Sequence, residues 1–148
     1  MRSSQRIRAA GAAAVMALVG MGSVVGCGPA GPRTYPVRGR VEATAGDVRP
    51  LAGSNVEAAL ESDPTVRASG VIQPDGRFTL ETLHAGVILK GAPAGTYQAR
   101  IILDDDGDRE ARRQRRAAVH PRFLQFKTSG LSFQVPADGD VILKVAPR

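Results

Sequence analysis

Hydrophobic and polar residues alternate in short runs from residue 37 to residue 145, a pattern that indicates half-buried β-strands. Val37, Gly39 and Val41 alternate with charged residues. Glycine, proline and aspartate interrupt the runs about every 8–12 residues, which is typical of an all-β sandwich. We therefore expect seven strands, at residues 37–43, 54–60, 67–72, 77–83, 96–103, 131–135 and 140–145.

The strongest local signal is the turn Gln73-Pro74-Asp75-Gly76. Proline presets φ at the second turn position, aspartate can bond to its own backbone, and glycine accepts positive φ. This turn predicts a hairpin between residues 67–72 and 77–83. Because the loop is longer than two residues, a bulged hairpin is favoured.

Residues 104–127 carry no strand signal and are rich in acidic residues and arginines. A polar stretch of this length predicts one long insertion loop that is functional, partly disordered, or both. Within it, residues 109–119 are compatible with a short helix. Asp108 would be its N-cap, and Pro121 stands just beyond its end.

The first 27 residues have the layout of an export signal. Arg2, Arg6 and Arg8 precede an uncharged stretch that ends at Cys27, the only cysteine of the chain. The segment resembles a bacterial lipoprotein signal, whose lipobox is matched by the tripeptide Val24, Val25, Gly26. This resemblance implies cleavage after residue 26, a diacylglyceryl group on Cys27 that anchors the protein in a membrane, and a tether over residues 27–36.

Two other interpretations of this segment stay open: an uncleaved membrane anchor, for which 18 Gly- and Ala-rich residues are barely long enough, and secretion with a free cysteine. With a lipobox, the domain is expected outside the cytoplasm, in the bacterial cell envelope. Gly28 provides no inner-membrane retention signal, so the outer membrane is expected where one exists.

Composition supports one domain, over residues 37–148, with a core of mostly aliphatic side chains, because the chain has no tryptophan. The chain has 20 lysines and arginines against 14 acids. Without the three leader arginines, 17 basic residues remain, and the net charge falls from +6 to +3. This small excess does not indicate nucleic-acid binding.

Several segments, in this order and spacing, resemble the carboxypeptidase regulatory-like (transthyretin-like) domains found in small bacterial lipoproteins. The matching segments are residues 37–41 (VRGRV), 50–56 (PLAGSNV), 74–78 (PDGRF), 91–101 (GAPAGTYQARI), 120–123 (HPRF) and 128–131 (TSGL). The resemblance implies a single seven-stranded immunoglobulin-like or transthyretin-like β-sandwich. It implies no activity, because such domains serve as accessory modules.

The residues also argue against an enzyme. A zinc carboxypeptidase needs two histidines and a glutamate as ligands, but His84 and His120 are the only histidines and neither lies in a His-x-x-Glu pattern. The chain also lacks Gly-x-Ser-x-Gly and the C-terminal Tyr-Arg-Gly-Ser of related hydrolases. We expect no catalytic residues and no cofactor.

Two candidate sites lie in the polar insertion. Carboxylates at every second position could ligate Ca²⁺, although their spacing is not that of an EF-hand loop; they are Asp104, Asp106, Asp108 and Glu110. An arginine run could contact anionic groups; it comprises Arg112, Arg113, Arg115 and Arg116. For both sets, the alternative is a solvated surface on which the acids and arginines balance each other.

The sequence thus predicts a non-catalytic envelope module that binds an unknown protein or polysaccharide, or contributes to envelope structure. The alternative is a small-ligand or Ca²⁺ carrier that uses residues 104–127.

Overall fold

Eleven strands in three sheets lie within residues 31–148, the part of the chain that the computed structural model describes. The largest sheet has the order β10–β9–β3–β4–β6–β7. Its strands are β3 (Asn55–Leu60), β4 (Asp63–Val71), β6 (Glu81–His84), β7 (Val87–Lys90), β9 (Gly95–Ile102) and β10 (Leu131–Val135). A three-stranded sheet, β11–β2–β5, comprises β2 (Arg38–Ala43), β5 (Arg77–Thr79) and β11 (Val141–Val145). The short strand β1 (Thr34–Tyr35) pairs with β8 (Ala92–Pro93).

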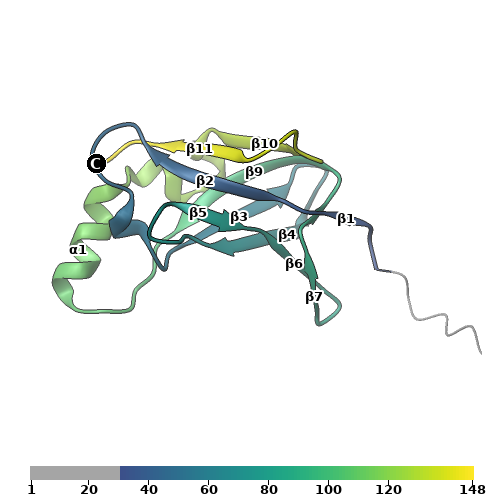
Figure 1. Ribbon diagram of the computed structural model, residues 1–148, viewed down its shortest axis with the longest axis horizontal. Helices are drawn as coiled ribbons and strands as arrows, with labels where there is room; N and C mark the ends of the chain where they lie inside the picture. Colours follow the sequence, from purple (N-terminus) through teal and green to yellow (C-terminus); the bar gives the residue numbers. More distant parts are fainter. Residues whose placement is uncertain (1–30) are drawn as a thin grey trace, which may run out of the picture. The chain divides into compact units, whose positions relative to one another are not determined.

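The two larger sheets enclose one hydrophobic core (Figure 1). Val41 and Leu143 enter it from the three-stranded sheet, and Val56, Tyr97 and Ile101 enter it from the six-stranded sheet. Strands make up 46% of the described residues and helices 18%, so this part of the chain is mostly β, which is consistent with the predicted all-β sandwich. The alternation of hydrophobic and polar residues reflects burial: along β2 and β9, the inward-facing residues are buried and the residues between them are not.

The seven predicted strands each overlap a strand of the structure, but one of them is divided. Residues 77–83 form β5, which pairs with β2, and β6, which pairs with β4 through Ala68 and Thr82. The predicted hairpin is therefore confirmed for β6, which pairs with β4, but not for β5, which pairs with β2 instead. The chain crosses between sheets at the buried Leu80, whose N–H donates to Val37 O at 3.0 Å. The turn itself is confirmed, since Gly76 has φ +83° and donates to Gln73 O at 2.8 Å.

The last two strands separate in the same way. β10 runs antiparallel to β9, whereas β11 joins the other sheet parallel to β2. Three further strands, β1, β7 and β8, have no counterpart among the predicted seven. β1 lies in the expected tether, so residues 34–35 of that segment already pair with the domain.

The predicted insertion loop is largely helical. It contains α1 (Arg109–Ala118), η2 (Pro121–Leu124) and α2 (Phe126–Ser129); a further short helix, η1 (Arg49–Leu51), precedes β3. The predicted helix and its Asp108 cap are confirmed. The rest is ordered because Val119 and Phe123 are buried in the core and Ser129 Oγ donates to Ala99 O at 2.6 Å. Within residues 31–148, no helix has the length and hydrophobicity needed to cross a membrane.

Candidate functional site

Helix α1 forms where the sequence provides both a cap and helix-favouring residues. The Asp108 carboxylate accepts the N–H of Ala111 at 2.8 Å, which satisfies one of the free donors of the first turn. Glu110 lies in the first turn, and Arg115 and Arg116 lie in the last. Acidic residues near the start and basic residues near the end interact favourably with the helix dipole.

Arg115 fixes α1 to the segment before it. Its guanidinium donates to Asp104 O at 3.2 Å and to Asp106 O at 2.5 Å, and it lies 3.1 Å from an Asp104 carboxylate oxygen. The Arg115 side chain is only 14% exposed. Asp104 is itself positioned by Ser54, a fully buried serine whose hydroxyl accepts the Asp104 N–H at 3.1 Å. This arginine therefore has a structural role.

The residues after β11 hold the other end of α1. Arg148 N–H donates to Ala117 O at 3.1 Å, and His120 N–H donates to Ala146 O at 2.7 Å. This pairing brings the Arg148 side chain to the arginines of α1, although the two are far apart in sequence. Arg148 and the arginines of α1 therefore share one surface, at the end of the domain where Figure 1 shows α1 beside the C-terminus.

An open pocket of about 520 Å³ lies on this surface. Its lining contains five arginines and one alanine, namely Arg109, Arg112, Arg113, Arg116, Ala117 and Arg148. We call these five arginines the arginine cluster. An adjoining pocket of about 430 Å³ shares Arg116 and Arg148 with the first and adds hydrophobic walls from Ile102, Leu103 and Leu124.

Most of the cluster makes no ion pair with an acidic side chain of the described residues. Arg113 lies 4.0 Å from Glu110, and both side chains are exposed. Within residues 31–148, Arg109, Arg112, Arg116 and Arg148 form no ion pair. Arg116 and Arg148 also share the adjoining pocket with Asp105. Like charges held close together repel, and an anion placed among the guanidinium groups would reduce that repulsion.

Three of the four predicted arginines belong to the cluster, and Arg115 does not. Sequence reasoning did not assign Arg109 and Arg148 to the site. Arg109 has a signal, because it precedes Arg112 and Arg113 by three and four positions and so shares their helix face. Arg148 has none, because only the tertiary pairing of the chain after β11 brings it to α1.

The predicted calcium ligands are not brought together. Asp104 pairs with Arg115 and accepts the N–H of Asp106 at 3.0 Å, Asp108 caps α1, and Glu110 is exposed on the helix. Across the part of the chain that the structure describes, no three His, Cys, Asp or Glu side chains are grouped closely enough to hold a metal ion.

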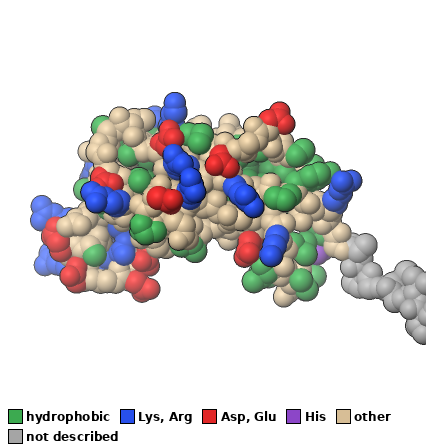
Figure 2. Space-filling view, viewed as in Figure 1, with side chains coloured by type: hydrophobic (Ala, Val, Ile, Leu, Met, Phe, Trp, Pro, Cys, Tyr) green, Lys and Arg blue, Asp and Glu red, His purple; other side chains and the backbone are tan. Residues whose placement is uncertain are grey.

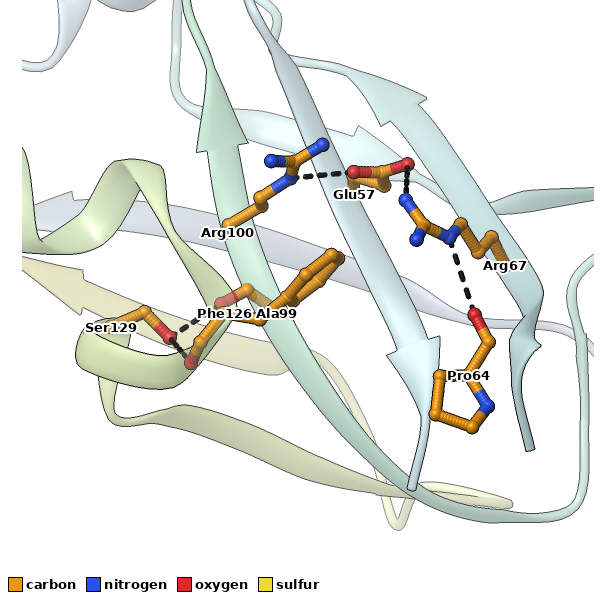
Figure 3. Close-up of polar contacts among 7 residues, drawn as sticks. All are labelled: Glu57, Pro64, Arg67, Ala99, Arg100, Phe126 and Ser129. Carbon is orange, nitrogen blue, oxygen red and sulfur yellow. Dashed lines mark hydrogen bonds and ion pairs between the residues drawn. The ribbon is translucent and has the colours of Figure 1, made fainter. Parts of the chain in front are cut away.

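A second charged cluster lies on the outer face of the six-stranded sheet. Glu57 accepts from Arg67 at 2.9 Å and from Arg100 at 2.6 Å, and Figure 3 shows it between them. Both guanidiniums also lie over the Phe126 ring, 5.4 Å and 4.8 Å from its centroid. Burial raises the pKa of Glu57, but the two hydrogen-bonded arginines outweigh it and hold the pKa below its ordinary value. These groups are mutually paired, and they attach α2 to the sheet.

The lipobox residues Val24, Val25 and Gly26, and Cys27 itself, lie outside the described residues. Comparison of the chain with protein-family models, with curated proteins and with solved structures found no match.

Proposed function

We propose that this chain is a lipid-anchored, non-catalytic module of the bacterial cell envelope that binds an acidic polysaccharide through the arginine cluster. The observation that carries the proposal is the pocket beside α1, which five arginines line, four of them without an ion pair within residues 31–148. The lipobox and Cys27 support the location, as does the resemblance to transthyretin-like lipoprotein domains of the immunoglobulin-like sandwich type.

The ligand class follows from the guanidinium group. Arginine is always charged and donates paired hydrogen bonds that match a carboxylate or a phosphate. Several arginines in an open pocket of about 520 Å³ suit repeated anionic groups better than one small ion. The hydrophobic walls of the adjoining pocket, including Leu103 and Leu124, suit the apolar faces of sugar rings.

The position of the cluster favours a polymer over lipid headgroups. The described chain begins near β1, at one end of the domain, whereas α1 lies at the opposite end (Figure 1). A lipid on Cys27 would hold the β1 end at the membrane. The arginine cluster would then face away from that membrane, toward the surrounding polymers.

The test measures the affinity of the protein for polygalacturonate, which carries repeating carboxylates, and for polyglutamate, at low and high salt. The double variant R112Q/R116Q should bind polygalacturonate about 30-fold more weakly, from about 1 kcal/mol per basic residue. The matched control R49Q/R77Q removes the same charge from exposed arginines outside the cluster and should bind normally.

The two polymers distinguish the possible partners. Binding to polyglutamate alone would replace the polysaccharide with an acidic protein segment. Equal loss in both double variants would mean that only net charge matters, and it would overturn the assigned site. Failure of the wild-type protein to bind either polymer at low salt would overturn the proposed function.

A further inference from the structure

The β6–β7 hairpin carries an unusual concentration of exposed hydrophobic side chains. Leu83 is 69% exposed, Val87 58% and Ile88 65%. Six large hydrophobic residues are exposed within residues 31–148, and these three lie in one hairpin at the edge of the six-stranded sheet. Figure 2 shows hydrophobic side chains over this hairpin. An exposed apolar edge strand invites aggregation unless something covers it.

The exposed side chains occupy both faces of the hairpin. Leu83 pairs with Ile88, and His84 pairs with Val87, so neighbouring positions point to opposite faces. Thr82, at the base, is buried, which marks the point where the hairpin leaves the domain. A flat protein partner would cover one face only. Lipid would surround the tip and cover both.

The hairpin also lies where the tether reaches the domain. A Cβ atom built on Gly31 would lie 3.7 Å from His84 Cδ2 and 3.7 Å from Leu89 Cδ1. Cys27 precedes Gly31 by four residues, so its Cα lies at most about 14 Å from that of Gly31. A bilayer that holds a lipid on Cys27 is therefore within reach of the hairpin.

We infer that the tip of the β6–β7 hairpin inserts into the interface of the membrane that anchors the protein. This inference rests on the lipid anchor of the proposed function and adds a second membrane contact to it. Insertion is shallow, because β7 is an edge strand whose unpaired backbone groups need water or headgroups as partners. Glu81 and Lys90, paired across the base of the hairpin, would lie among the headgroups.

A second contact has a consequence for function. A lipid anchor at one point of a tether leaves the domain free to rotate, whereas the anchor and the hairpin together define an orientation. With the β1 end held down, α1 and the arginine cluster lie at the far end of the domain (Figure 1). The hairpin would thereby keep the cluster directed away from the membrane.

The test uses the lipidated protein, cleaved after residue 26, in vesicles of phosphatidylethanolamine and phosphatidylglycerol with brominated acyl chains, which quench tryptophan. The chain contains no tryptophan, so Ile88→Trp introduces a single probe. We expect its emission to shift to the blue and to lose intensity relative to unbrominated vesicles. The matched control is Ile102→Trp, at a 39% exposed isoleucine that ends β9 on the side leading to α1, and it should not be quenched.

Vesicle flotation separates this inference from the anchor. If the Ile88→Trp protein floats with the vesicles but bromine leaves its tryptophan emission unchanged, the hairpin inference is overturned and the anchor stands. Equal quenching in both variants would also overturn it, because the domain would then have no defined orientation. If mass spectrometry finds no lipid on Cys27 and the protein does not float, the anchor and the hairpin inference fail together.

Discussion

Arg115 and Arg116 are adjacent in α1, but the same substitution should affect stability at one and ligand binding at the other. Arg115 is 14% exposed and binds the segment that precedes the helix, whereas Arg116 is exposed and lines the pocket. We predict that R115Q lowers the stability of the domain, and that R116Q leaves stability unchanged but weakens polymer binding.

The magnitude follows from the contacts of Arg115. Its guanidinium makes two hydrogen bonds to carbonyls, those of Asp104 and Asp106, and one ion pair with the Asp104 carboxylate at 3.1 Å. A hydrogen bond to a charged group contributes about 1.5–3 kcal/mol, but contacts that share one side chain do not add fully. We therefore expect R115Q to lower the free energy of unfolding by about 2–3 kcal/mol, or Tm by about 6–15 °C. R116Q should change it by less than about 0.5 kcal/mol.

Thermal unfolding followed by circular dichroism, together with titration of polygalacturonate, measures both effects. Binding to R115Q is compared well below its Tm, where its cluster arginines remain in place. The assignment of roles would be wrong if R116Q destabilised the domain as much as R115Q. It would also be wrong if R115Q unfolded like the wild-type protein.

Three further predictions concern stability. Hydrogen bonds to the Glu57 carboxylate lower its pKa, so the stabilisation they provide is complete above the ordinary glutamate pKa of about 4.3 and is lost as pH falls through the lowered value. E57Q should therefore cost about 1–2 kcal/mol at pH 7, and urea titrations should show this difference shrinking below about pH 4. Tyr97 is fully buried and donates to Pro93 O at 3.0 Å, so Y97F should cost about 1 kcal/mol in the same assay. Gly91 has φ +85°, and a Cβ there would overlap the Tyr35 carbonyl, so G91A should cost about 2–4 kcal/mol; a wild-type unfolding midpoint would contradict this packing.

Local patterns predicted most of the strands but only part of their pairing. The alternation around Val41 and the turn at Gly76 are properties of a few consecutive residues, and both are confirmed. The division of residues 77–83 between two sheets depends on the contact of Leu80 with Val37, which are distant in sequence. The turn at residues 73–76 could not reveal this division. The same turn can precede a strand that stays in one sheet or a strand that crosses to another sheet.

The candidate site was likewise predictable only where it depends on local sequence. The helix and its Asp108 cap follow from local chemistry, and so does the density of arginine along α1. Local chemistry does not reveal which of these arginines are available to a ligand. Arg115 is taken by Asp104, and Arg148 joins the cluster because the chain after β11 returns to α1. The order of the insertion depends on Phe123, whose burial requires the assembled core.

The most direct test of the central claim is arginine footprinting with phenylglyoxal, which modifies accessible guanidinium groups, on the protein with and without polygalacturonate. Mass spectrometry then reports the modification of each arginine. Protection is expected only at the five arginines of the cluster, with Arg49 and Arg77 unchanged. Protection spread evenly over all exposed arginines, or confined to residues outside the cluster, would contradict it.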